Sequence, residues 1–370
     1  MKLISAFLAS LESGKAGKAL RAALPAIDQR YEHFLRYEAE FGGMIYGTNT
    51  LPGHRDGDLL DHVDHGAYQL ELIRKHCIGG APYFGSDVAR AVTLAKVYSC
   101  LEPGVTLSGA LVGAALDAFE AEDFQPQIPR NSSYSSGDVI PAAHWSAALL
   151  DWQAKRSSYV LRPGEGMALI NGAFAHVGAT AALCSRIKTF WPLLLEAQRI
   201  SLTVMGADRR AFRVMGAPEA SWGAASNAYV SADLEDHTSA RQDPVSTRSV
   251  VQCLGALTAA IDVLFSACDA SLSKPSGNPL FFEEPMRGHA PNGSFLDPAL
   301  TIFTGAVIEA LLMTGWASVQ RINHMLSGKN EPIPMDAATP DDPMGLIQWP
   351  KNAQAKLEKM RRACGTRAFV

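Results

Sequence analysis

Residues able to do chemistry are concentrated in three segments that break the helical pattern of the chain. Residues 42–58 are rich in glycine and contain Tyr46, residues 125–141 are crowded with serine, and residues 273–295 combine Pro, Gly and Asn. A tyrosine on a glycine-flanked loop that can close can remove a proton from a substrate, and an arginine such as Arg248 can bind a carboxylate through two parallel hydrogen bonds. Loops of this kind between long helices are typical of functional sites, although ordinary surface loops share their composition.

The segment Ser135-Ser136-Gly137, followed by Asp138, resembles the cofactor-forming segment of the histidine and aromatic amino-acid ammonia-lyase family, where Ala-Ser-Gly precedes Asp. In that family the glycine nitrogen attacks the carbonyl of the first residue, two waters leave, and the central serine becomes the exocyclic methylene of 4-methylidene-imidazole-5-one (MIO). Glycine is needed last because it allows the tight bend. The resemblance implies an MIO cofactor formed from Ser135, Ser136 and Gly137. Taken alone, the motif also fits a helix cap.

Six further segments resemble motifs of the same family and follow the family's order over about residues 44 to 350. Met44–Thr50 is similar to the YGxNT loop, which implies that Tyr46 is the catalytic base. The segment QDPVSTR is similar to QDxYSxR, which implies that Gln242 hydrogen-bonds cofactor or substrate and that Arg248 binds the substrate carboxylate.

The remaining matches concern hydrogen bonding and the substrate side chain. EGMALING resembles EGLALxNG and implies a hydrogen-bonding role for Asn171, and SGNPL implies a substrate contact from Asn278. LIRKHCIG resembles the segment whose polar pair contacts the substrate side chain, which implies roles for Lys75 and His76. For Lys75 a solvated lysine on a helix is an equal alternative. NGSF resembles the loop that places an aromatic ring, here Phe295, near the cofactor.

Several positions depart from the family pattern. Val245 stands where the family has a second active-site tyrosine, which leaves the substrate contacts and the reaction type open, and Gly277 replaces an aspartate. The chain ends at Val370, without the usual C-terminal segment. We therefore expect a short and divergent member of the family.

The elements that position these residues are predicted to be helices. Apolar residues recur every three to four positions after Ser86 and Ser108, which we expect to act as helix caps, and again over residues 243–272 and 298–326. Alternating β patterns are scarce. We predict one mainly helical domain over residues 1–370. The resemblance implies an all-α bundle of the MIO ammonia-lyase type, with the site built from loops at helix ends and from more than one subunit of a homotetramer.

Composition excludes several other classes of protein. The 370 residues contain 33 Lys and Arg against 37 Asp and Glu, so nucleic acid and anionic lipid are not expected as partners. The absence of an uninterrupted apolar stretch of about 18 residues argues against a membrane span. The six cysteines show no CxxC spacing, which favours free thiols and a cytoplasmic location. The segment from Asp61 to His65 has HxxH spacing, but a solvated turn is favoured, and no metal is expected.

These observations predict an ammonia-lyase or a 2,3-aminomutase that acts on histidine or on an aromatic or modified amino acid. One alternative is an enzyme of this fold that isomerises, cyclises or dehydrates an amino-acid-derived substrate. Another is a catalytically silent subunit or binding protein.

Overall fold

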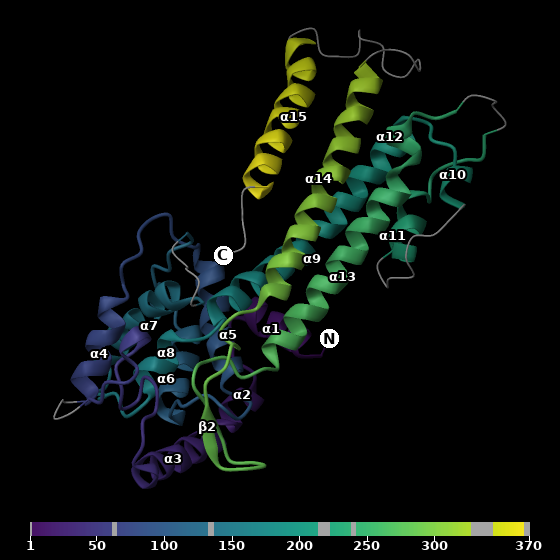
Figure 1. The fold of residues 1–370 in the computed structure, drawn as a ribbon. Helices are drawn as coiled ribbons and strands as arrows, with labels where there is room; N and C mark the ends of the chain where they lie inside the picture. Colours follow the sequence, from purple (N-terminus) through teal and green to yellow (C-terminus); the bar gives the residue numbers. More distant parts are fainter. Residues whose placement is uncertain are drawn as a thin grey trace. The chain divides into compact units, whose positions relative to one another are not determined.

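The structure of the protein is a computed structural model that describes residues 2–60, 65–131, 137–213, 223–237, 242–326 and 343–365. Nearly all regular structure in these ranges is α-helix, which confirms the predicted all-α class (Figure 1). Contacts group the chain into two compact units, one mainly of Met1–Ser185 and Ala267–Leu300, the other mainly of Arg186–Ser266 and Thr301–Phe369. The single domain expected over residues 1–370 stays a prediction.

The first unit surrounds one buried helix, α5, in which every residue from Val88 to Ser99 except Arg90 is buried. Helices α4, α7 and α8 contact one another in the same unit (Figure 1). Strands β1 and β2 pair antiparallel, with Leu280 opposite Ala290. The elements of this unit are α1 (Lys2–Ser13), α2 (Lys18–Ala22), α3 (Leu24–Phe41), the short 3-10 helix Gly53–Arg55, α4 (His65–Lys75), α5 (Ser86–Ser99), α6 (Gly109–Glu120), α7 (Val139–Ala154), α8 (Glu165–Ile170), β1 (Leu280–Phe282) and β2 (Gly288–Ala290).

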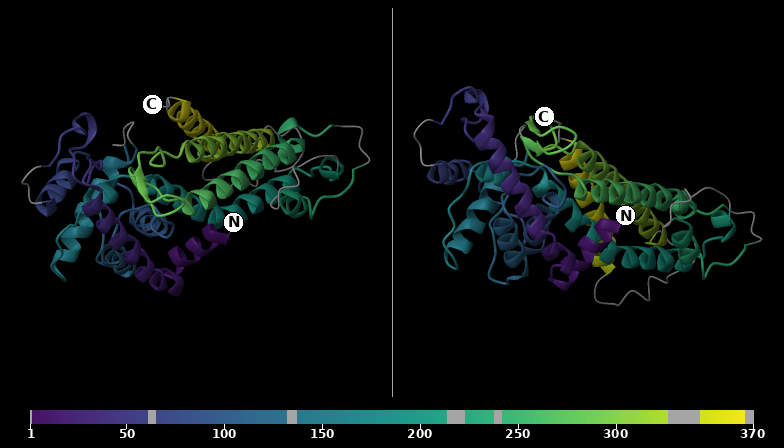
Figure 2. Two further views of the ribbon diagram at one scale, coloured as in Figure 1. Left: turned by 60° about the horizontal axis from the view of Figure 1, so that its bottom comes forward. Right: turned by 90° about the horizontal axis from the view of Figure 1, so that it is seen from below.

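The second unit is dominated by long helices. Within it, the corresponding parts of α9, α13 and α14 run alongside one another in both views of Figure 2. Helix α15 packs on α14, because a Cβ at Gly315 would lie 3.0 Å from Cδ2 of Leu357. The elements with residues in this unit are α9 (Phe174–Val204), α10 (Arg210–Arg213), α11 (Gly223–Val230), α12 (Val245–Arg248), α13 (Val250–Leu272), α14 (Pro298–Leu326) and α15 (Pro343–Gly365).

Helix boundaries agree with the sequence in part. The Ser108 side chain caps α6 by accepting from the Leu111 backbone N–H at 3.3 Å, and α14 spans the expected residues. The expectation that Ser86 caps α5 is wrong, because Ser86 is its first helical residue and Gly85 is the N-cap. The single helix expected over residues 243–272 is also wrong. It is interrupted at Ser249, whose backbone (φ −91°, ψ 2°) leaves the helical region and separates α12 from α13.

Three described helical stretches are long and apolar enough to cross a membrane, judged by length and composition alone. Within their most apolar windows, 83% of residues are buried for Glu165–Val204, 50% for Val245–Leu272 and 28% for Pro298–Leu326. In the part of the chain that the structure describes, much of the apolar surface of α14 is therefore exposed.

Candidate active site

The loop that carries Tyr46 is fixed by the side chain of its own Asn49 and by contact with α8. Asn49 accepts from the Ile45 backbone N–H through Oδ1 at 2.7 Å, and its Nδ2 donates to the Gly43 carbonyl at 2.9 Å. Gly47 has φ +66°, and a Cβ there would lie 2.6 Å from the Met167 side chain. Glycine is thus required both by the backbone and by the contact with α8. The Tyr46 hydroxyl accepts only a long bond, 3.2 Å, from the Gly53 backbone N–H among the described residues.

Asn171 is the C-cap of α8 and is buried. Its backbone N–H continues the helical ladder to the Met167 carbonyl at 2.9 Å, and its Nδ2 donates to the Asn278 carbonyl at 3.4 Å. Its Oδ1 has no hydrogen-bond partner among the described residues. An unpaired buried acceptor is costly, so a ligand that donates a hydrogen bond to this oxygen would remove that cost.

A series of short contacts links the segment that begins at Asn171 to Gly137, the residue after the two predicted cofactor serines. The Ser276 hydroxyl accepts from the Ala173 backbone N–H at 2.6 Å and donates to the Ser294 carbonyl at 3.0 Å. Next to Ser294 in the chain, Phe295 packs on Gly137, where a Cβ would lie 2.8 Å from the Phe295 carbonyl oxygen. The structure thus brings together four predicted site residues, namely Gly137, Asn171, Asn278 and Phe295. Ser135 and Ser136 lie outside the described residues.

The two residues predicted to contact the substrate side chain, Lys75 and His76, lie at the C-terminal end of α4, which Gln69 ties to α8. The Gln69 side chain is buried, accepts from the Gly166 backbone N–H at 2.6 Å and donates to the Arg162 carbonyl at 2.9 Å. His76 bonds the Leu72 carbonyl through Nδ1 at 2.8 Å, so Nδ1 carries the proton and Nε2 is an acceptor in the neutral ring.

Lys75 differs from His76 in its surroundings. Its side chain is 71% exposed and its Nζ lies 2.8 Å from Glu71, one turn back on α4. This arrangement favours the solvated alternative for Lys75, whereas the role of His76 stays a prediction.

The other three predicted residues belong to the second unit. Gln242 precedes α12, and Val245 and Arg248 are its first and last residues. All three side chains are exposed, Val245 by 66%. Their roles stay predictions.

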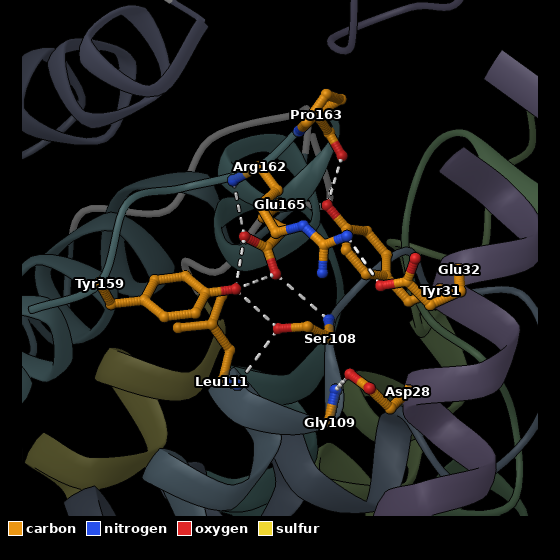
Figure 3. A network of polar contacts seen from close by, with 10 residues as sticks. All are labelled: Asp28, Tyr31, Glu32, Ser108, Gly109, Leu111, Tyr159, Arg162, Pro163 and Glu165. Carbon is orange, nitrogen blue, oxygen red and sulfur yellow. Dashed lines mark hydrogen bonds and ion pairs between the residues drawn. The ribbon is translucent and has the colours of Figure 1, made fainter. Parts of the chain in front are cut away.

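A buried carboxylate at the first residue of α8 was not singled out by the sequence analysis, although it lies inside the EGMALI motif. Glu165 accepts from the Tyr159 hydroxyl at 2.8 and 2.9 Å, from the Arg162 backbone N–H at 2.8 Å and from the Ser108 backbone N–H at 3.2 Å (Figure 3). Burial raises the pKa of Glu165, and these hydrogen bonds oppose the rise. Burial, together with the charge of Glu165, raises the pKa of Tyr159. A carboxylate at this end of α8 also complements the helix dipole.

The opposite end of α8 meets a buried cation that the sequence analysis also missed. Lys96 of α5 is 2% exposed, and its Nζ donates to the Ala168 carbonyl at 2.5 Å and lies 4.6 Å from the centre of the Phe174 ring. Helix α8 is therefore held at its N-terminal end by the acidic side chain of Glu165 and near its C-terminal end by the basic side chain of Lys96. The only feature of the sequence that could have indicated the burial of Lys96 is its position inside the apolar pattern of residues 88–99.

Lys96 makes stability depend on pH. Burial lowers its pKa from 10.5 to about 8. Below about pH 8 the lysine is charged in both the folded and the unfolded chain, and between about pH 8 and 10.5 only the unfolded chain keeps the proton. The contribution of Lys96 to the free energy of unfolding therefore rises over this window, by up to about 3 kcal/mol. Denaturant titrations of the wild type and of Lys96→Met at pH 7 and pH 10 measure it, and an unchanged pH dependence in the variant contradicts the assignment.

The described residues contain no group of three or more His, Cys, Asp or Glu side chains arranged to hold a metal ion. Of the HxxH segment considered above, Asp61, His62 and Asp64 lie outside the described residues.

Comparison with known proteins identifies the family of the chain. Residues 4–365 match the family model described as aromatic amino acid lyase. Over 377 residues the chain is 26% identical to the tyrosine ammonia-lyase of Cupriavidus metallidurans, covering 86% of this chain and 69% of that protein. Over 338 residues it is 26% identical to the tyrosine 2,3-aminomutase of Chondromyces crocatus, covering 78% of this chain and 64% of that protein. The solved structure of a tyrosine aminomutase from Streptomyces globisporus matches 97% of this chain and 76% of its own, with a TM-score of 0.82 at 20% identity.

The chain belongs to the aromatic amino acid lyase family. The predicted family resemblance and the predicted helical fold are both confirmed. Both predicted reaction classes, ammonia-lyase and 2,3-aminomutase, occur among its relatives, and the chain spans about two thirds of the length of the two relatives named above.

Proposed function

We propose that the protein is an ammonia-lyase or a 2,3-aminomutase that acts on an α-amino acid, either histidine or one with an aromatic or modified side chain. The observation that carries this proposal is the unpaired, buried Oδ1 of Asn171 beside Asn278, on the helix that also supports the Tyr46 loop. A buried acceptor of this kind suits the amino group of the substrate, and Tyr46 supplies a base on a neighbouring loop.

The residues present fit an MIO group formed from Ser135, Ser136 and Gly137. Gly137 has φ +87° and lies against Phe295, a tight position that only glycine occupies without strain. Asp138, the N-cap of α7, accepts from the His176 backbone N–H at 2.7 Å and so fixes the chain directly after the tripeptide. When formed, MIO supplies an electrophilic methylene that activates the substrate for loss of its amino group.

The side chains of this protein supply the remaining requirements. Tyr46 removes the β-proton of the substrate, and Arg248 binds its carboxylate with a planar pair of donors that lysine cannot match. Asn171 and Gln242 hydrogen-bond the substrate or cofactor, while His76, Asn278 and Phe295 bound the space for the side chain. The valine at position 245, where the family has a tyrosine, motivates a second candidate, an isomerisation, cyclisation or dehydration of an amino-acid-derived substrate.

We also propose a homotetramer whose sites draw on more than one copy. The exposed positions of Gln242 and Arg248 and the largely uncovered apolar surface of α14 support this arrangement. The five cysteines whose side chains are described are free thiols, which supports a cytoplasmic location.

The intact mass of the purified protein tests the proposal. We expect the wild type to be two waters lighter than its sequence, Ser136→Ala to have full mass, and the neighbouring control Ser133→Ala to keep the loss. Ammonia release from a panel of amino acids then separates a lyase from the second candidate. Full mass in the wild type contradicts both the lyase and the mutase assignments.

A further inference from the structure

The second unit contains a charged side chain that is completely buried. Arg321 on α14 is 0% exposed, and no Asp or Glu among the described residues forms an ion pair with it. Burial lowers the pKa of its guanidinium from 12.5 to about 10, a value at which it still carries its charge at neutral pH.

Arg321 satisfies its donors with neutral oxygens from two neighbouring elements. On α9, Nε donates to the Ser201 hydroxyl at 3.1 Å and Nη2 donates to Oε1 of Gln198. Nη2 also bonds the hydroxyl of Ser318, one turn back on α14, at 3.1 Å. Nη1 donates at 2.7 Å to the backbone carbonyl of Ser246, in α12.

The contact with Ser246 stands out because α12 is too short to be stable by itself. A helix of one turn gains few hydrogen bonds for the backbone freedom it loses. Around α12, backbone bonds run from Thr247 and Arg248 to the Pro244 carbonyl, at 2.9 and 3.2 Å, and from Ser249 to the Val245 carbonyl, at 2.9 Å. The charged guanidinium of Arg321 donates to the Ser246 carbonyl, and such a bond is stronger than these neutral ones.

A buried guanidinium is a poor way to gain stability, since an apolar side chain of similar volume often serves as well. Its bond to α12 therefore needs another reason. Ser246 lies between Val245 and Arg248, two of the predicted site residues, so fixing its carbonyl fixes the direction in which Arg248 leaves the backbone.

We propose that Arg321 is a positioning residue that holds α12 so that Arg248 presents its guanidinium to the substrate carboxylate. This inference rests on the proposed function for the role of Arg248, but not for the contact with Ser246. The two parts can therefore be tested separately.

Hydrogen exchange tests the contact without any substrate. In Arg321→Met we expect the amides of Thr247, Arg248 and Ser249 to exchange about tenfold faster or more, as loss of a charge-assisted bond predicts. Amides in the middle of α9 and α13 should keep their wild-type rates. The control is Arg199→Met, which removes an arginine of α9 that pairs at the surface with Glu196 and Asp233. Wild-type exchange in α12, or equal acceleration throughout the unit, overturns the proposal.

Kinetics test the consequence for the substrate. We expect Arg321→Met to raise KM for the amino acid about tenfold while kcat changes less, because binding of the carboxylate is weakened in ground and transition state alike. Arg321→Lys, which keeps a charged donor, should recover part of the loss, and it also serves if the methionine variant does not fold. An unchanged KM in the folded methionine variant overturns the link to Arg248, and if only the lysine variant folds, an unchanged KM in that variant does so. If the wild type turns over no amino acid, the proposed function fails while the exchange result still decides the role of Arg321.

Discussion

Replacing Tyr46 by phenylalanine lowers kcat by about 100- to 10,000-fold, the range expected when a general base is removed. The variant keeps the ring and loses only the hydroxyl, whose one bond among the described residues is the long one from Gly53. The loop should therefore keep its fold, since Asn49 and Gly47 fix it independently of the hydroxyl. Steady-state kinetics on the preferred amino acid measure the effect, with KM changing little.

Tyr68→Phe is the matched control for this variant. Tyr68 lies on α4, and burial, followed by the nearness of Tyr46, raises its pKa. Its loss should change kcat by less than about threefold, as for a residue outside the reaction. Tyr46→Phe should still lose two waters, because formation of the cofactor does not need the base. More than a tenth of wild-type activity in Tyr46→Phe would remove Tyr46 from the mechanism.

Replacing Glu165 by leucine should lower the free energy of unfolding by about 3 kcal/mol or more. The carboxylate is the acceptor for the Tyr159 hydroxyl and for the backbone N–H groups of Ser108 and Arg162 (Figure 3). Each buried donor left without a partner costs about 1–3 kcal/mol. Glu165→Gln keeps the shape and part of the accepting capacity, so its loss should be smaller. Equilibrium denaturation in urea, followed by circular dichroism, measures both.

The control is Glu32→Gln at the edge of the same network. Glu32 accepts from Arg162 at 2.7 Å, but both side chains are about two-fifths exposed, and such pairs contribute less than about 1 kcal/mol. A loss in Glu165→Leu no larger than that in Glu32→Gln would show that the buried carboxylate is not what holds the start of α8.

The helical fold could be predicted from the sequence, and the segments proposed for the site could be located in it, because both leave local signals. Apolar periodicity marks helices such as α6 and α14, and short motifs mark Tyr46, Asn171 and Arg248. Helix boundaries were less predictable, since the break at Ser249 comes from backbone geometry between two regions of equal helical pattern.

The supporting residues of the site could not be predicted, because their meaning depends on contacts distant in sequence. Lys96 bonds a carbonyl 72 residues away and Arg321 one 75 residues away, and neither belongs to a motif. From the neighbouring sequence alone, a charged residue within an apolar helix is predicted to be a solvated side chain. Only the fold shows that these two are buried and that each meets a short helix carrying a predicted site residue.

The two charges that hold α8 have a consequence for how substrate preference can diverge. Both lie inside the chain, so mutations that alter the surface leave the position of Asn171 unchanged. Helix α4 is joined to α8 through Gln69, well before its C-terminal end. At that end, Lys75 beside His76 points to solvent. Substitutions at residues 75 and 76 can therefore accumulate without disturbing the contacts that hold α8. Under the proposed function, in which His76 contacts the substrate side chain, this separation allows one reaction to be retained while the recognised side chain changes.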